Sequence, residues 1–112
     1  MNPSPSPFAA TPSPPYFAVI FTSRRTDGDQ GYGGMTARMV ELASRQPGFL
    51  GVESVRGTDD FGITVSYWAS LESIRHWKQQ EEHLAAQEKG RRVWYADYQV
   101  RVCEVLREYG TL

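Results

Sequence analysis

The chain has 112 residues, which is enough for one domain with a single hydrophobic core. Its 12 Lys and Arg residues and 13 Asp and Glu residues give a formal net charge of −1, whereas phosphate binding requires clustered positive charge. No apolar stretch approaches the length of about 18 residues that a membrane-spanning helix needs. We therefore expect a globular protein that binds neither nucleic acid nor a membrane.

A single cysteine, Cys103, excludes an intrachain disulfide and suits a reducing compartment. It lies within a β-like run, so we expect a buried and unreactive thiol. The first residues lack the basic start and the apolar centre of a signal peptide. The sequence therefore predicts a cytoplasmic protein.

Residues 1–15 contain six of the seven prolines and no charged side chain. Because proline fixes φ and lacks a backbone donor, we expect a disordered or polyproline-like tail. The folded domain is then expected over residues 16–112.

Seven segments are expected within that domain, from the spacing of apolar residues and the position of breakers, and the two consecutive helical pieces count as one element of the fold. They are a strand over Tyr16–Arg25, a helix carrying Tyr32, Met35, Met39, Leu42 and Ala43 that ends before Pro47, strands over Phe49–Thr58 and Gly62–Trp68, a helix capped by Ser70 with an apolar stripe of Leu71, Ile74 and Trp77, a second helical piece over Glu82–Tyr95, and a strand over Gln99–Leu106. This order is β-α-β-β-α-β, which predicts an α+β, ferredoxin-like fold.

The first strand also predicts a homodimer. Tyr16, Ala18 and Ile20 alternate with three further apolar residues, so both faces of the strand are apolar. Two helices can cover only one face of the sheet. An identical sheet from a second subunit would cover the other face.

The histidines and the tryptophans are the candidate site residues. His83, Gln87 and Trp94 follow at i, i+4 and i+11, which on a helix forms one face; this face either lines a pocket or is a polar surface with one anchoring indole. His76 and His83 would be about 10.5 Å apart along a helix, too far to bind one metal ion, so no metal site is predicted.

Trp68, Trp77 and Trp94 lie in the second half of the chain. Such residues either form core or provide flat walls for an aromatic molecule. Arg25 ends the first strand and either anchors a phenolate or carboxylate or is solvated.

Four segments carry a family resemblance: the opening strand AVIFTSRR, the segment QPGFLGVES, the strand ITVSYW, and the pattern S-x-E-S-I-x-x-W over Ser70–Trp77. In this order and spacing, from Tyr16 to about Tyr109, the chain resembles the antibiotic biosynthesis monooxygenase family. The resemblance implies an antiparallel sheet that packs on a partner's sheet as a dimeric α/β barrel, with a pocket between sheet and helices. Many members oxidise quinols or anthrones with dioxygen and use no flavin, haem or metal.

The resulting hypothesis is a cofactor-independent monooxygenase that acts on a small aromatic or quinol-like molecule. His83 is predicted to be the catalytic base, Trp68, Trp77 and Trp94 the walls, and Gln87 and Arg25 the polar anchors. The alternative is a non-catalytic binding or stress-related module with the same pocket. A third possibility is a haem-binding member; Trp77 matches the haem-degrading branch, but the first strand has no asparagine and Gln87 stands where that branch has its histidine.

Overall fold

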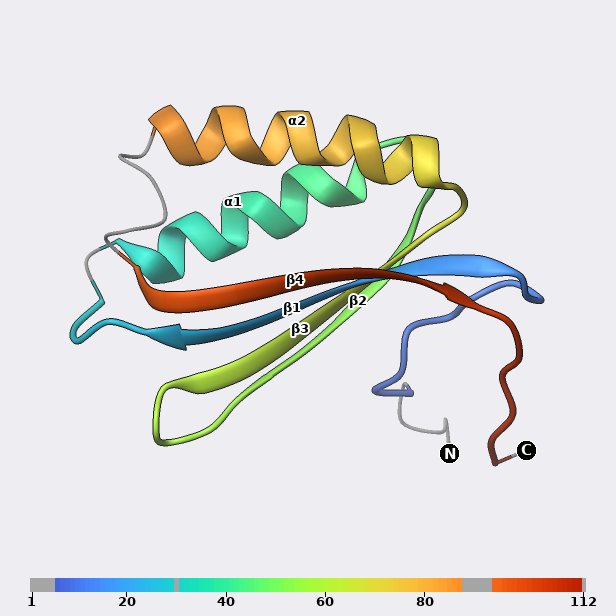
Figure 1. The fold of residues 1–112 in the computed structure, drawn as a ribbon, viewed down its shortest axis with the longest axis horizontal. Helices are drawn as coiled ribbons and strands as arrows, with labels where there is room; N and C mark the ends of the chain where they lie inside the picture. The colour runs from blue at the N-terminus through green and yellow to red at the C-terminus, as the bar shows by residue number, and fades with distance from the viewer. Residues whose placement is uncertain (1–5, 30, 88–93, 112) are drawn as a thin grey trace, which may run out of the picture.

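The computed structural model describes residues 6–29, 31–87 and 94–111, except for the side chains of residues 84–87. The elements are β1 (Tyr16–Arg25), α1 (Tyr32–Ser44), β2 (Phe49–Arg56), β3 (Phe61–Trp68), α2 (Leu71–Gln87) and β4 (Tyr95–Val105). This confirms the predicted β-α-β-β-α-β order. The strands form one antiparallel sheet in the order β2-β3-β1-β4 (Figure 1).

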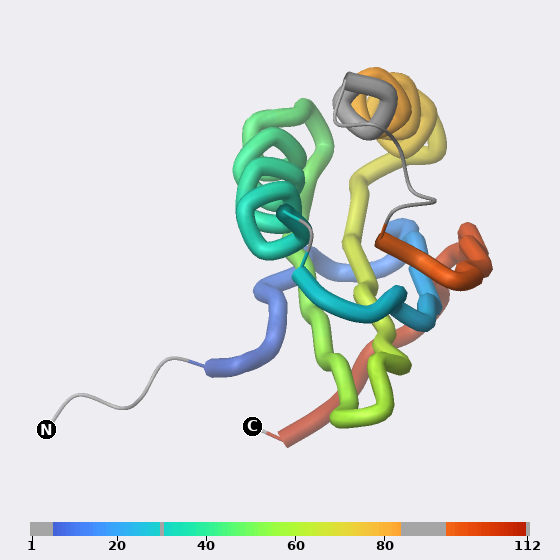
Figure 2. Tube along the Cα trace, turned by 90° about the vertical axis from the view of Figure 1, so that its left-hand side faces the viewer, coloured from blue at the N-terminus to red at the C-terminus, as the bar shows by residue number. Residues whose placement is uncertain are grey.

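The molecule has two layers, with both helices on one face of the sheet (Figure 2). The segments next to the two ends of the chain lie on the opposite face (Figure 1). We call these the helix face and the open face. This arrangement confirms the α+β, ferredoxin-like class. Neither helix covers the open face (Figure 2).

Short-range contacts fix where the helices begin. The Asp29 carboxylate accepts the backbone N–H groups of Gly31 and Gly33, each at 3.1 Å, at the start of α1. Ser70 Oγ accepts the N–H of Ser73 at 3.1 Å, which confirms Ser70 as the cap of α2. Gly48 has φ 86°, and a Cβ there would lie 2.0 Å from Ser73 Oγ, so only glycine allows β2 to start beside α2.

Two predictions in this region are wrong. A helix over Glu82–Tyr95 is contradicted at its end, because Tyr95 already pairs with Arg25 as the first residue of β4. The His83–Gln87–Trp94 face therefore does not exist as one helical face, although residues 88–93 lie outside the described part. Leu71 of the predicted apolar stripe is exposed, whereas Ile74 and Trp77 are buried; Leu71 is the first residue of α2 and lies beyond the packed part of the helix.

The core lies between the helices and one end of the sheet. Trp68 is fully buried, with its ring stacked on that of Trp77 (centroids 5.9 Å apart, interplanar angle 22°) and meeting the Phe49 ring edge-on. Its indole Nε1–H donates to Ser66 Oγ at 2.9 Å, so its single polar group is paired. Ala43 and Ile74 complete the buried cluster.

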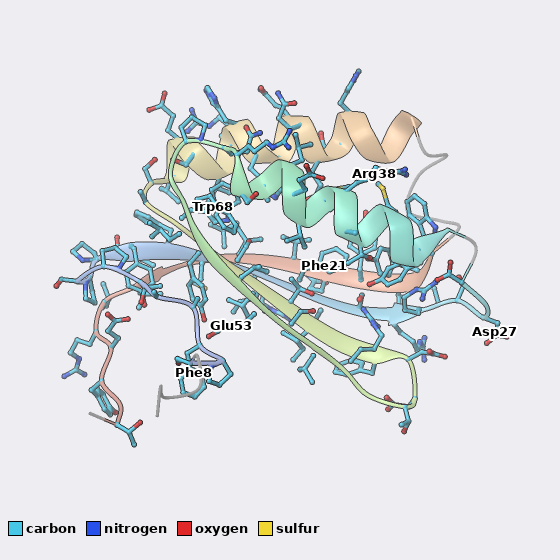
Figure 3. The ribbon with its side chains drawn as sticks, turned by 180° about the vertical axis from the view of Figure 1, so that it is seen from behind. Phe8, Phe21, Asp27, Arg38, Glu53 and Trp68 are labelled. Atoms are coloured by element: carbon cyan, nitrogen blue, oxygen red, sulfur yellow. The ribbon has the colours of Figure 1, made fainter. Side chains whose placement is uncertain are left out.

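One end of the open face is covered by the chain's own termini. Tyr16 and Tyr67 meet edge-to-face and donate to Glu108 (2.5 Å) and Glu53 (2.6 Å), respectively. The Ala9 N–H also donates to the Glu53 carboxylate, at 3.0 Å, and the Thr11 hydroxyl donates to Glu108, at 2.7 Å. Phe8 and Glu53 lie on this face, opposite Trp68 (Figure 3). Residues 6–15 thus have no helix or strand before Tyr16 but contact the sheet; the limit between tail and domain stays a prediction.

The other end of the open face is uncovered and apolar. Val55, Phe61 and Ile63 are 70%, 49% and 37% exposed there. Cys103 is also exposed, so the predicted burial of its thiol is wrong for the single chain. It pairs with Ala18 on the open face of an edge strand, where no helix packs.

Candidate functional site

A cavity of about 390 Å³ lies between the helix face of the sheet and the two helices. Its walls are mainly apolar and come from both helices, all four strands and the residue before β4; they include Val19, Met39, Ala43, Trp77, Trp94 and Tyr95. This volume and lining are typical of a site for a small organic molecule.

The cavity opens along the edge strand β4. Val100 and Val102 pair with Phe21 and Val19 and so point to the helix face, yet they remain 41% and 51% exposed. Both line the cavity. Trp68, on the same face of the sheet, is fully buried, so the exposure of these two valines marks the entrance.

Aromatic rings gather at one end of the cavity. Phe21 stacks on Tyr98 (centroids 5.4 Å apart) and meets Tyr95 edge-on, and Tyr95 in turn meets Tyr32 edge-on at 5.8 Å. All four residues line the cavity. Flat rings set at these angles form walls that suit a flat aromatic guest.

Arg25 positions the loop that carries Tyr32 into this end. Its guanidinium donates to the backbone oxygens of Trp94 (3.1 Å), Gly28 (3.1 Å) and Asp29 (3.3 Å). The same group lies 3.5 Å from the centroid of the Tyr32 ring, a close cation–π contact. Arg25 therefore connects β1, the residue before β4 and the start of α1.

A second guanidinium lies near the same ring. Arg56 Cζ is 5.9 Å from the Tyr32 centroid, and its N–H groups donate to Ser23 Oγ at 2.8 Å and to the backbone oxygen of Asp60. The Tyr95 hydroxyl donates to the Tyr32 hydroxyl at 3.5 Å, a long contact compared with the usual range of about 2.5–3.0 Å. Two arginines and two phenols thus meet at one end of the cavity.

The surroundings shift the pKa values of the two phenols in opposite directions. Burial raises the pKa of Tyr32, but hydrogen bonds with Tyr95 and Thr36 and the charge of Arg56 lower it, and the net pKa lies below the usual 10.0. Burial and the hydrogen bond with Tyr32 raise the pKa of Tyr95 above that value. The surroundings thus favour a phenolate at Tyr32 and disfavour one at Tyr95.

The predicted site residues separate into three groups. Trp77 and Trp94 line the cavity, and Arg25 lies behind its aromatic end, against Tyr32. Trp68 is buried in the core beneath Trp77. His83 is exposed on α2 and is not among the lining residues, while the side chain of Gln87 lies outside the described part.

The sequence analysis missed Tyr32 and Tyr95. They are 63 residues apart in the chain, and they meet because the register of β4 against β1 places Tyr95 opposite Arg25. The available signal was weak: an arginine ends β1, and a tyrosine between glycines begins α1 seven residues later. Such spacing does not specify which side chains converge.

No helix among the described residues is long and apolar enough to cross a membrane. No group of three or more His, Cys, Asp and Glu side chains within residues 6–29, 31–87 and 94–111 is arranged to hold a metal ion.

Fold and cavity together define a ferredoxin-like α+β protein with a largely apolar cavity between its sheet and its helices. The chain belongs to the antibiotic biosynthesis monooxygenase family, whose model matches residues 15–89. The uncharacterized protein YqjZ of Bacillus subtilis strain 168 is 60% identical over 98 residues, which cover 88% of this chain and 86% of YqjZ.

Solved structures share the fold at low sequence identity. A mutant of SnoaB, a cofactor-independent oxygenase from Streptomyces nogalater, superposes with a TM-score of 0.69 at 14% identity, covering 84% of this chain and 95% of SnoaB. PA3566 from Pseudomonas aeruginosa gives a TM-score of 0.64 at 13% identity, covering 88% of this chain and all of PA3566. At these identities the likeness is one of fold.

Proposed function

We propose that the protein is an oxygenase that oxidises a small hydroxyaromatic or quinol-like molecule with dioxygen and without a bound cofactor. The observation that carries the proposal is the cavity of about 390 Å³, with aromatic walls and a phenol–guanidinium group at one end. Family membership and the oxygenase activity of SnoaB support the same reaction type.

The chemistry needs little from the protein beyond binding and proton transfer. An electron-rich ring that loses a hydroxyl proton becomes an anion that can reduce oxygen itself. For a ring carrying a CH₂ group, CH₂ and O₂ give C=O and H₂O, so the substrate supplies all the electrons. Apolar walls keep water out and the flat rings hold the substrate in one orientation.

We also propose that the protein acts as a cytoplasmic homodimer. Val55, Phe61 and Ile63 form an exposed apolar area on the open face, and burying one such side chain contributes about 1.5–3 kcal/mol. A second copy of the sheet packed on this face would cover these residues and the exposed thiol of Cys103. The cavity lies on the other face of the sheet and stays accessible in such a dimer.

Oxygen consumption tests the proposed reaction. The purified protein, without added flavin or metal and with a chelator present, would be mixed with dihydroxynaphthalenes and hydroxyanthrones, and uptake followed with an oxygen electrode. Uptake above the rate without protein is the expected result, with water as the second product and the ring oxygenated: an anthraquinone from a hydroxyanthrone, and a hydroxynaphthoquinone from a dihydroxynaphthalene. Binding of these rings without any uptake would contradict the oxygenase and support the non-catalytic binding module instead.

A further inference from the structure

Tyr32 lines the largely apolar cavity and carries an ionisable hydroxyl group. Four separate elements converge on it: Arg25 from β1, Arg56 from β2, Tyr95 from β4, and the start of α1, which carries Tyr32 itself. The ring faces Arg25 at 3.5 Å, and its hydroxyl is 3.5 Å from that of Tyr95. This geometry concentrates positive charge and a proton donor around one phenol.

The two guanidinium groups favour a negative charge at this position. The hydrogen bonds of Arg25 go to backbone oxygens, and those of Arg56 go to backbone oxygens and the Ser23 hydroxyl. Such partners satisfy the donors but do not neutralise the charge. A phenolate at Tyr32 would supply the missing negative charge in a partly buried setting, where opposite charges attract more strongly than in water.

Among the described residues, four more charged or titratable side chains line the cavity: Lys78, Glu81 and Glu82 from α2, and Tyr98 from β4. Asp29 lies beside the ring; its backbone oxygen accepts the Tyr32 N–H and its carboxylate caps α1. Tyr95 can only donate to an ionised Tyr32. The Tyr95 proton can therefore be shared between the two phenol oxygens. An ionised Tyr32 oxygen has further lone pairs, and one of these can accept a proton from a molecule in the cavity.

We infer that Tyr32 is the catalytic base, which accepts the hydroxyl proton of the bound ring, and that Tyr95, Arg25 and Arg56 favour its ionised form. The inference rests on the proposed function and specifies the substrate further: a hydroxyaromatic whose hydroxyl group points to the α1 end of the cavity. In the step, the substrate O–H bond breaks, a Tyr32 O–H bond forms, and the electron pair stays on the substrate oxygen. The net charge beside the two arginines is unchanged.

A titration without substrate tests the ionisation. The near-ultraviolet absorbance of tyrosinate would be followed with pH; of the six tyrosines, one should ionise below the rest. This early step should be absent in Tyr32→Phe, move to higher pH in Tyr95→Phe, and persist in Tyr109→Phe, which alters an exposed ring outside the cavity lining. An early step that persists in Tyr32→Phe would overturn the inference.

The rate of oxygen uptake tests the catalytic role. A base must be deprotonated to act, so the wild-type rate should rise with pH through the Tyr32 pKa. Tyr32→Phe should lose this rise and about 10²–10⁴-fold of the rate, while Tyr109→Phe keeps both. Circular dichroism and the unfolding midpoint would show that each variant is folded.

The failures of the two proposals can be distinguished. A Tyr32→Phe protein that retains the wild-type rate and pH profile overturns the role of Tyr32 but leaves the oxygenase in place. A wild-type protein that consumes no oxygen with any hydroxyaromatic overturns the proposed function, and the catalytic role of Tyr32 with it.

Discussion

Replacing Trp68 by alanine should destabilise the fold more than the same change at Trp77. Trp68 is fully buried between Phe49 and Trp77 and donates a hydrogen bond to Ser66, whereas part of the Trp77 indole faces the cavity. Truncating a buried aromatic side chain costs about 3–5 kcal/mol through lost contacts and the void that remains. At Trp77 the cost should be nearer the lower limit, because the face toward the cavity has no packed atoms to lose.

These losses of stability can be measured as decreases in the midpoint temperature of thermal unfolding. For a chain of this length, 1 kcal/mol corresponds to about 4 °C, so Trp68→Ala should lower the midpoint by about 12–20 °C. If that variant does not fold, Trp68→Phe keeps an aromatic ring but loses the hydrogen bond to Ser66, and a smaller drop is expected. Trp77→Ala should fold and bind hydroxyaromatics more weakly. Equal midpoints for Trp68→Ala and Trp77→Ala would refute the assignment of Trp68 to the core.

The remaining predictions concern assembly, the termini and the base. Light scattering should give about twice the chain mass of 12.7 kDa; a value near 12.7 kDa would contradict the dimer. Removing residues 1–15 should leave a folded protein whose midpoint falls by no more than about 5 °C, since the loss is a few mostly exposed hydrogen bonds; a failure to fold would show that the segment belongs to the domain. Hydrogen bonds from Tyr16 and Thr11 hold the pKa of Glu108 below its usual 4.5. Its ionised form therefore stabilises the fold above about pH 4.5, and this contribution disappears as the pH falls through the lower pKa of the folded state, so the midpoints of wild type and Glu108→Gln should converge in acid. The His83→Ala variant should keep the wild-type rate of oxygen uptake, because the His83 side chain is exposed on α2 and does not line the cavity. A hundredfold loss of that rate would instead identify His83 as the catalytic base.

The sequence was sufficient for the fold because local signals agreed with it. The aromatic and β-branched run of β1, the break at Pro47 and the Ser70 cap each act over a few residues, and the structure confirms all three. The error after Glu82 has a physical reason. Tyr95 and its neighbours also fit a helical period, and pairing of Tyr95 with Arg25, a tertiary contact, selects the strand.

The candidate site was only partly predictable. Trp77 and Trp94 were identified because large aromatic residues are conspicuous in a sequence. Trp68 lies in the core and Trp77 lines the cavity. This difference depends on how α2 packs over the two rings, which the sequence does not show. Likewise the meeting of Tyr32 with Tyr95 depends on strand register, which sequence spacing does not contain.

Binding of a hydroxyaromatic in the cavity is the most direct test of the account. Calorimetry under nitrogen, with a dihydroxynaphthalene as the probe, separates binding from oxidation. Val100→Trp places an indole at the entrance, and Ala37→Trp adds the same ring to an exposed position of α1 outside the cavity lining. We predict one ring bound per chain in wild type and Ala37→Trp, and at least about tenfold weaker binding in Val100→Trp, equivalent to about 1.4 kcal/mol. Equal affinities in all three proteins, or no binding to wild type, would contradict the assignment of this cavity as the functional site.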